Sequence, residues 1–259
     1  MNAFKLLFLG TSARNYSPKL NNECKDKFDK TARRSACALL NDNILIDCGF
    51  HTLNAMDIAG VKKSDIKTLF ITHFHDDHFN LESVQSIANS KTQPLDIFVS
   101  DGAVVPTIEN AVIHYLKKGE KMQFQNGITI TSLLANHDKE VFPQHLLFEK
   151  DGEKFLYACD GAWFLTETFY ALKDSNLALF VVDCTVGDRV GDYRICEHNS
   201  IPMLRLMLPS LKTFNIIDDK TKIFASHIAY SLHDTSEVTE KVLNDIGVAL
   251  AYDGMIVKA

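Results

Sequence analysis

The sequence lacks any apolar run long enough to cross a membrane, and it lacks a run of basic residues. A membrane-spanning helix needs about 20 consecutive apolar residues, so we expect no contact with a bilayer. The net charge is −6, and the pair Arg33-Arg34 is too short to form the basic face that binds nucleic acid. A long nucleic acid is therefore not the expected partner, although a local basic pocket stays open.

The sequence has no Cys-x-x-Cys pair, and its first residues do not predict a secretory signal. The six cysteines are scattered, at positions 24, 37, 48, 159, 184 and 196. The first apolar run, 4–9, is short and leads straight into a glycine turn, unlike a signal peptide. We therefore predict a cytoplasmic protein whose cysteines are buried thiols and do not form disulfide bridges.

No internal repeat, low-complexity tract or linker divides the chain. It has 259 residues, of which 46% are apolar and 23% are charged. This composition is typical of a globular protein with an ample core. We predict one domain over residues 1–259, since a chain of this length needs no second core.

Strand-like and helix-like segments alternate along the chain, which favours an α/β fold. Residues 13–34 are polar and predict a long surface loop. The predicted strands are 4–9, 35–40, 43–47, 68–71, 95–99, 128–134, 146–149, 154–158, 179–184, 222–225 and 248–252. The predicted helices are 51–59, 81–88, 103–118, 164–172, 200–208 and a last one from a capping box at 234–237 to residue 246. Hairpin turns are expected at 41–43, at Asp151-Gly152 and at Asp253-Gly254.

One short stretch carries most of the chemistry, the sequence Thr72-His73-Phe74-His75-Asp76-Asp77-His78. Three imidazoles and two carboxylates are costly to bury unless they are paired or bound to a metal. In an extended segment His73 and His75 share one side, so both can hold the same ion. The turn into the following helix can direct Asp77 and His78 to a second ion. Imidazole and carboxylate together suit zinc, iron or manganese.

Three further polar residues follow predicted strands, namely His137, Asp160 and His227. Alone, either histidine would more often be a loop or core residue, and Asp160 a turn residue. Beside the motif, we interpret all three as metal ligands aimed by strand ends. Cys159 competes with Asp160, but neighbours in a strand face opposite ways, so we assign Cys159 to the core.

Asp47 is a candidate for a supporting role. It ends the predicted strand at 43–47, and its carboxylate can hold the outer nitrogen of a ligand imidazole. The alternative is a plain turn aspartate ahead of Gly49.

The ordered motifs resemble the metallo-β-lactamase superfamily. The resemblance rests on 72–78, His137, Asp160 and His227, with Leu9-Gly10-Thr11-Ser12 and Ile46-Asp47-Cys48-Gly49 before them. It implies an αββα sandwich of two mixed β-sheets flanked by helices, with two divalent metal ions between the sheets. Zinc is the expected metal, with manganese or iron as alternatives. The resemblance implies that one ion is held by His73, His75 and His137, the other by Asp77, His78 and His227, and that Asp160 bridges them.

Within this superfamily the chain is most similar to the phosphodiesterase branch, which includes cyclic phosphodiesterases of phosphonate breakdown and tRNase Z. The similarity rests on Asp183-Cys184-Thr185, His198-Asn199-Ser200 and His227. Asp160 follows His137 by only 23 positions, which leaves no room for the flexible arm of tRNase Z. Cys24 stands alone in its loop, so the structural zinc of the phosphonate enzymes is not expected. Glyoxalase II-like and secreted β-lactamase functions are disfavoured, because the chain ends 32 residues after His227 and no signal peptide is expected.

The resulting hypothesis is a metal-dependent hydrolase, a phosphodiesterase acting on a small or cyclic phosphate ester through a metal-bound hydroxide. Asp77 and His198 are the predicted catalytic residues, with His198 as the general acid and His233 as its rival. Alternatives are a thioester, lactone or amide hydrolase of the same fold, and a non-catalytic metal-binding domain. A di-iron oxidoreductase would normally need a flavin domain, and none is expected. A small molecule is the expected partner, and a homodimer stays open.

Overall fold

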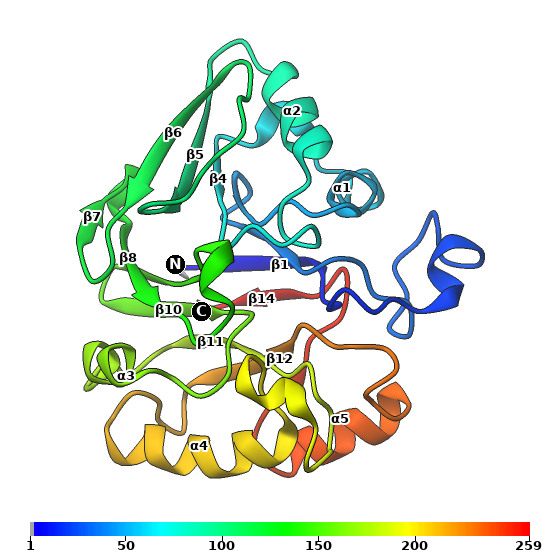
Figure 1. Cartoon of the computed structure of the whole chain (residues 1–259), viewed down its shortest axis with the longest axis vertical. Helices are drawn as coiled ribbons and strands as arrows, with labels where there is room; N and C mark the ends of the chain where they lie inside the picture. The colour runs from blue at the N-terminus through cyan, green and yellow to red at the C-terminus, as the bar shows by residue number, and fades with distance from the viewer. Residues whose placement is uncertain (1–2) are drawn as a thin grey trace.

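The computed structural model describes residues 3–259, which form two seven-stranded sheets with helices on their outer faces (Figure 1). The first sheet has the order β14-β1-β2-β3-β4-β5-β6 and the second β13-β12-β11-β10-β9-β8-β7. The first contains β1 (Lys5–Gly10), β2 (Cys37–Leu40), β3 (Ile44–Ile46), β4 (Thr68–Phe70), β5 (Leu95–Ser100), β6 (Ala111–Leu116) and β14 (Ile256–Lys258). The second contains β7 (Lys121–Gln123), β8 (Thr129–Leu134), β9 (Gln144–Lys150), β10 (Glu153–Ala158), β11 (Leu179–Asp183), β12 (Lys222–Ser226) and β13 (Ala249–Leu250).

Within residues 3–259, five α-helices cover the two sheets. Figure 1 shows α1 (Thr52–Ala59) and α2 (Leu81–Asn89) on the first sheet. The second sheet is covered by α3 (Thr166–Leu172), α4 (Ile201–Thr213) and α5 (Ser236–Asn244). No helix among residues 3–259 is both long enough and apolar enough to cross a membrane. The predicted αββα sandwich of two mixed sheets is confirmed.

Aromatic side chains fill the space between the sheets. Phe8 meets Phe224 across the two layers, and Phe4 meets Phe155, each pair with ring centroids 5.9 Å apart. Two further apolar clusters lie outside the sheets, one under α1 and α2 and the other under α3, α4 and α5. Strands β3, β4 and β11 are buried at every residue, as expected when both faces of a sheet are covered.

The strand directions explain where the polar residues gather. Strands β3 to β6 are mutually parallel, as are β10 to β13. Strand β8 also runs with β10, because both are antiparallel to β9 between them. The carboxyl ends of β8, β10, β11 and β12 therefore lie along one edge of the second sheet, and β4 ends opposite them.

Local turn chemistry was predicted well in two places. In the β9–β10 hairpin, Asp151 and Gly152 have φ of 51° and 84°, as a two-residue turn with both φ positive requires. Helix α1 ends at Gly60, which takes the left-handed conformation at its C-cap. Helix α4 runs further than predicted, to Thr213, and includes Pro209.

The predicted helix over 103–118 is wrong. Residues 111–116 form β6, which pairs in parallel with β5 at the edge of the first sheet. The apolar spacing mimicked a helix, but Pro106 precedes the segment, Asn110 turns with φ of 56°, and the β-branched pair Val112-Ile113 favours a strand. The short strand β7 was not predicted, since its three residues carry no clear pattern.

The predicted hairpin at Asp253-Gly254 is also wrong. Strand β13 pairs with β12 in the second sheet, whereas β14 pairs with β1 in the first. The turn at Gly254, with φ of 88°, therefore carries the chain from one sheet to the other. A turn signal cannot show which sheet receives the next strand.

The loop at 13–34 is mostly irregular, as predicted, but it is firmly attached. It holds one short 3₁₀ turn, η1 (Pro18–Asn21). The fully buried Arg34 donates from Nη2 to the carbonyl of Cys24 at 2.7 Å and from Nε to Asn54 Oδ1 at 2.7 Å. A buried guanidinium therefore ties the loop to α1, in a part of the chain where no cysteine cluster is present.

Candidate metal centre

Five strand ends deliver polar side chains to one place between the sheets. His73 follows β4, His137 follows β8, Asp160 follows β10, Asp183 ends β11, and His227 follows β12. Each of these five residues is 7% exposed or less. So many buried ionisable groups in contact require either mutual pairing or a bound cation.

The first group consists of His73, His75, His137 and Asp160. One ligand atom from each lies within 4.8 Å of every other. His75 Nδ1 lies 3.1 Å from His73 Nε2 and 3.2 Å from His137 Nε2. Nitrogens bound to one zinc ion in a tetrahedron, at 2.0–2.1 Å each, lie about 3.3–3.4 Å apart. The three imidazoles therefore have the spacing of ligands to one ion.

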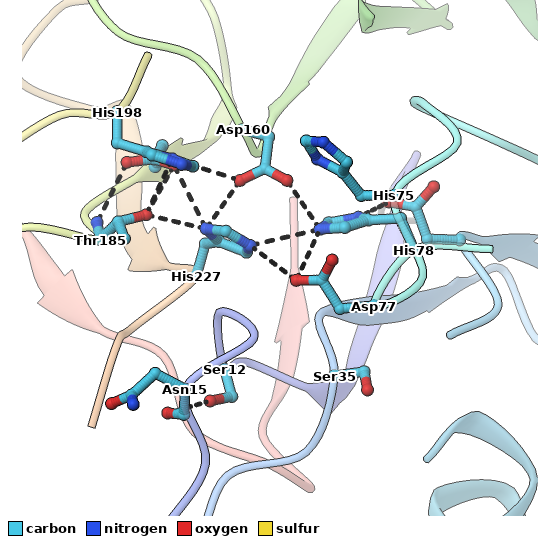
Figure 2. Close-up of polar contacts among 12 residues, drawn as sticks. Ser12, Asn15, Ser35, His75, Asp77, His78, Asp160, Thr185, His198 and His227 are labelled. Atoms are coloured by element: carbon cyan, nitrogen blue, oxygen red, sulfur yellow. Dashed lines mark hydrogen bonds and ion pairs between the residues drawn. The ribbon is translucent and has the colours of Figure 1, made fainter. Parts of the chain in front are cut away.

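The second group consists of Asp77, His78 and His227. The Nε2 atoms of the two histidines lie 3.2 Å apart, and Asp77 Oδ2 lies 3.7 Å from His78 Nε2 and 3.5 Å from His227 Nε2. Figure 2 shows these three side chains converging below Asp160. The spacing again suits one divalent cation.

Asp160 lies between the two groups. Its Oδ2 is 2.9 Å from His73 Nε2. The same oxygen is 2.8 Å from His78 Nε2, a contact drawn in Figure 2. Its Oδ1 lies 2.7 Å from His227 Nδ1, yet it accepts no well-directed hydrogen bond. A carboxylate in this position is suited to bridge two ions, and Cys159 points into the inter-sheet core instead.

Hydrogen bonds from outside hold the ligand candidates in place. The Asp47 carboxylate lies 2.8 Å from His78 Nδ1 and accepts from the Thr72 backbone N–H at 2.7 Å. His137 Nδ1 donates to the carbonyl of Glu197 at 3.2 Å. Such outer partners fix ring orientation and tautomer, which is the geometry expected for metal-binding histidines.

Three residues of the cluster have an unusual backbone. Asp47, Asp160 and His227 have φ of 63°, 50° and 60°, in the left-handed region that non-glycine residues seldom adopt. This conformation costs about 1 kcal/mol or more at each residue. The surrounding sheets maintain this strain, and it turns each side chain from the strand direction into the site.

The charges of the cluster are strongly coupled. Burial disfavours the ionised carboxylate of Asp160, but the imidazoliums of His227 and His78 outweigh it and keep the pKa of Asp160 far below its usual range. Burial likewise disfavours a charged His78, but Asp160, Asp77 and Asp47 raise its pKa to about 10. Without a metal the carboxylates thus hold protons on the imidazoles. A divalent cation satisfies the same carboxylates, so the donor set fits such an ion.

His198 lies beside this cluster, with its ring stacked on that of His227 at 5.4 Å. Its Nδ1 lies 2.9 Å from Asp183 Oδ2, so Nε2 is left for other partners. Burial lowers the pKa of His198, but the carboxylates of Asp183 and Asp160 outweigh burial and raise it. The histidine is 16% exposed and lines the pocket described below.

Sequence reasoning missed Asp183 and Thr185 as site residues. Asp183 is fully buried and accepts from the backbone N–H of Thr185 at 3.0 Å and of Asn199 at 2.9 Å. Thr185 Oγ1 lies 2.8 Å from His227 Nδ1 (Figure 2). The available signal was a carboxylate at the end of a buried strand, as for Asp160. A further group with the spacing of metal ligands consists of Asp160, Asp183, His198 and His227. The Asp183 carboxylate, however, already accepts hydrogen bonds from two backbone N–H groups and contacts His198.

The rival candidate His233 lies elsewhere. Its Nε2 is 2.7 Å from the carbonyl of Cys184 and 3.1 Å from the backbone nitrogen of Gly187. It does not line the pocket at the metal cluster but a separate cavity. Of the six cysteines, all are free and five are buried, whereas Cys196 is exposed.

A pocket of about 250 Å³ opens over the cluster. Small-ligand sites commonly measure about 300–1,000 Å³, so this pocket suits a small substrate. Arg14 lines one part of its wall and Arg194 another, and Arg14 also pairs with Asp76 at 2.7 Å. The remaining walls come from Ala13, Asn15, His75, Asp77, Asp160, Thr185, His198, His227, Ala229, Ser231 and Leu232.

Comparison with known proteins gives matches over parts of the sequence. Residues 35–103 match the family model described as "Anti-Pycsar protein Apyc1". The chain is 28% identical over 137 residues to the "Ribonuclease Z" of Pyrococcus furiosus, a match that covers 47% of this chain and 41% of that protein. The chain thus spans less than half the length of the curated relatives that it matches.

Solved structures match over the whole chain. The fold is similar to that of the metallo-β-lactamase fold protein YhfI from Bacillus subtilis, with a TM-score of 0.75 and 13% identity over 100% of both chains. It is also similar to human tRNase Z, short form, with a TM-score of 0.67 and 17% identity over 98% of both chains. The structure is thus an αββα sandwich with a His/Asp cluster of metal-ligand spacing at its strand ends. This chain has the metallo-β-lactamase fold, as the sequence resemblance implied, and about half of it is also similar in sequence to proteins named ribonuclease Z.

Proposed function

We propose that the protein is a metal-dependent hydrolase that cleaves a phosphodiester bond in a small or cyclic phosphate ester. The observation that carries this proposal is the position of Asp160 between two histidine groups, each spaced as ligands to one ion. His73, His75 and His137 would hold one ion, and Asp77, His78 and His227 the other, with Asp160 shared. Zinc fits this nitrogen-rich set best.

Two divalent ions in such a site supply an activated water and neutralise negative charge on phosphoryl oxygens. The protein's own residues would do the rest. His198, held by Asp183 through Nδ1, would donate a proton from Nε2 to the leaving oxygen. Asp183 would keep that ring in one orientation and stabilise its charged form. Asp77 would act by holding the second ion beside the reacting group.

The pocket wall supports an anionic substrate of limited size. Arg14 and Arg194 come from segments far apart in the sequence and line the same pocket of about 250 Å³. Guanidinium groups bind phosphate oxygens with good geometry. The ion pair of Arg14 with Asp76 is exposed at 74% and 60%, so exchanging Asp76 for a substrate oxygen costs little.

Thioester, lactone and amide hydrolysis are the alternatives within this fold. The relatives named ribonuclease Z add an RNA phosphodiester as a further substrate to test. The test combines elemental analysis of the purified protein with turnover of bis(p-nitrophenyl) phosphate, a cyclic phosphodiester, a thioester, a lactone and a short RNA. The proposal expects close to two transition-metal ions per chain and metal-dependent cleavage of the phosphodiesters. At most one ion, or turnover confined to the thioester or lactone, would contradict it.

A further inference from the structure

A second cavity, of about 490 Å³, lies between the loop at 13–34 and the start of α5. It is larger than the pocket over the metal cluster and falls within the common range for small-ligand sites. The two cavities share Ser231 in their walls.

Arg33 is the unusual residue in this cavity, because it is a charged side chain with only 7% exposure. Its Nη1 donates to Thr11 Oγ1 at 2.7 Å and to the carbonyl of Ala251. Across residues 3–259, no partner is found for its Nε or Nη2. Burial lowers the pKa of Arg33, and the nearby charges of Asp253 and Glu240 oppose that effect. A guanidinium presents five N–H donors, so the donors on Nε and Nη2 remain available in a residue that lines the cavity.

Other residues in the cavity wall also offer positive charge or hydrogen-bonding groups. Lys19 is exposed at the edge of the cavity, and Ser17 brings a hydroxyl from the same loop. The Thr31 hydroxyl also lines the cavity but already donates to Asp29 Oδ1 at 2.6 Å. His233 Nδ1 is buried and has no hydrogen-bond partner. Together these lining residues bring positive charge and hydrogen-bonding groups to one cavity, which matches the oxygens of a phosphate.

Two carboxylates also line the cavity, and their negative charge opposes the binding of a phosphate. Asp234 and Glu237 are both exposed, so water and salt screen their charges. Arg33 is buried, where electrostatic interactions are stronger. Arg33 thus places a buried cation in the cavity wall, partly offset by the buried Asp253 behind the lining, while the exposed residues at the mouth carry charges of both signs. This polarity suits a ligand with one anionic end and a neutral, hydroxyl-rich remainder.

We propose that this cavity is a second binding site, separate from the metal centre, for a small phosphorylated molecule whose phosphate is bound by Arg33 and Lys19. The site does not depend on hydrolytic activity. A ligand there lies against Ser231, whose backbone N–H donates to Asn15 Oδ1 at 2.6 Å. Asn15 and Ser231 also line the pocket over the metal cluster, so the ligand would contact the wall that the two cavities share.

The test is calorimetric titration of the metal-loaded full-length protein with inorganic phosphate, together with hydrogen exchange to locate protection. We compare the parent with Lys19→Gln, with Arg33→Lys and with Lys25→Gln, which removes an exposed lysine of the same loop that does not line the cavity. Lys19→Gln should weaken phosphate binding at this site about fivefold, Arg33→Lys at least about tenfold, and Lys25→Gln not at all. Because Lys19 is exposed, its replacement should leave the fold intact.

Hydrogen exchange should show phosphate-dependent protection over 228–237 in the parent, and the same protection in Asp160→Asn, whose metal centre is impaired. Acetate should bind at least about tenfold more weakly than phosphate, because it has fewer oxygens for the guanidinium and ammonium groups. Unchanged phosphate binding in Lys19→Gln and Arg33→Lys, protection confined to the metal pocket, or equal binding of acetate would each overturn the proposal. A failure of phosphodiester turnover would leave it untouched.

Discussion

At the scale of single residues, neighbouring positions have opposite roles. Cys159 is 1% exposed and belongs to the core between the sheets, where burial raises the pKa of its thiol to about 12. Asp160, one position later, turns with φ of 50° into the histidine cluster. Cys159 continues the alternation of β10 beyond its end and lies with Tyr157 in the inter-sheet core. The left-handed backbone at Asp160 then directs the next side chain into the cluster.

We therefore predict that Asp160→Ala strips the metal, whereas Cys159→Ala does not. Loss of the shared carboxylate removes a ligand from both groups of histidines. Loss of the thiol leaves only a small core cavity, which costs about 1 kcal/mol in the free energy of unfolding. The measurement is metal content after dialysis. Asp160→Asn is the control for the backbone, because asparagine keeps the shape of the side chain and tolerates the left-handed conformation at this position. Metal loss in the cysteine variant alone would reverse the assignment.

His198 provides the second prediction at this scale. Its Nδ1 is held by Asp183 and its ring borders the pocket, so a proton at Nε2 can reach a leaving oxygen. His198→Ala should slow hydrolysis of an ester with a poor leaving group by about 10²–10⁴-fold. It should slow an ester with a good leaving group, such as p-nitrophenolate, far less, because that group leaves without a proton.

The control for His198 is His233→Ala, which removes an imidazole outside the metal pocket. It should leave the ratio between the two leaving groups unchanged. Metal content must match the parent in both variants. If His198→Ala hydrolyses both esters at the parental rate, the histidine has no part in the reaction.

At the scale of secondary-structure elements, the loop after β4 depends on the loop after β3. The backbone of Cys48 donates to the carbonyl of His78, and Asn80 donates to the carbonyl of Cys48, each at 2.8 Å. Gly49 packs so closely there that an added Cβ would lie 1.9 Å from the Asp77 carbonyl oxygen. A glycine at this position lets the two loops touch, and the contact sets where Asp77 and His78 point.

We predict that Gly49→Ala lowers the free energy of unfolding by about 3 kcal/mol and reduces metal occupancy. The new methyl group must push the 72–78 loop away from β3. Gly60→Ala is the matched control, since Gly60 has φ of 69° and no atom within 4 Å of an added Cβ. It should cost about 1 kcal/mol with full metal content, measured by chemical denaturation and elemental analysis. Equal metal content in both variants would show that the loop contact does not position the ligands.

At the scale of the whole molecule, the metal cluster couples stability to pH. The folded metal-free protein holds a proton on His78, whose pKa is raised to about 10. A histidine has a pKa near 6.5 when the chain is unfolded. The stabilisation from this group is therefore complete below about pH 6.5 and is lost progressively as the pH rises towards 10.

We expect the thermal midpoint of metal-loaded protein to exceed that of chelator-treated protein by a margin that widens from pH 7 to pH 9. Two effects widen the margin as the pH rises. In the metal-free protein, the imidazoles lose the protons that pair them with the carboxylates. In the metal-loaded protein, protons compete less with the metal for the ligand atoms. Lys118 acts in the opposite direction, because burial lowers its pKa to about 7. Its effect is common to both samples and cancels in the difference. A margin that stays constant or narrows over this range would contradict the linkage.

The sequence by itself determined the parts that depend on local chemistry. The motif at 72–78, the turn at Asp151-Gly152 and the C-cap at Gly60 follow from residue types and spacing over a few positions. The ordered motifs also led to the sandwich fold, and the seven predicted ligand candidates lie together in the structure. Short-range signals of this kind need no knowledge of which elements become neighbours.

Tertiary structure decided everything that depends on pairing between distant segments. Residues 111–116 became an edge strand because β5 was there to pair with them, although their spacing also suited a helix. Asp253-Gly254 connects two sheets because β14 pairs with β1, at the other end of the chain. Asp183 acquired its role only when β11 brought it beside His198, and Arg33 lines a cavity only because α5 closes over its loop. Such contacts are fixed by the packing of the two sheets, and no local pattern in the sequence encodes them.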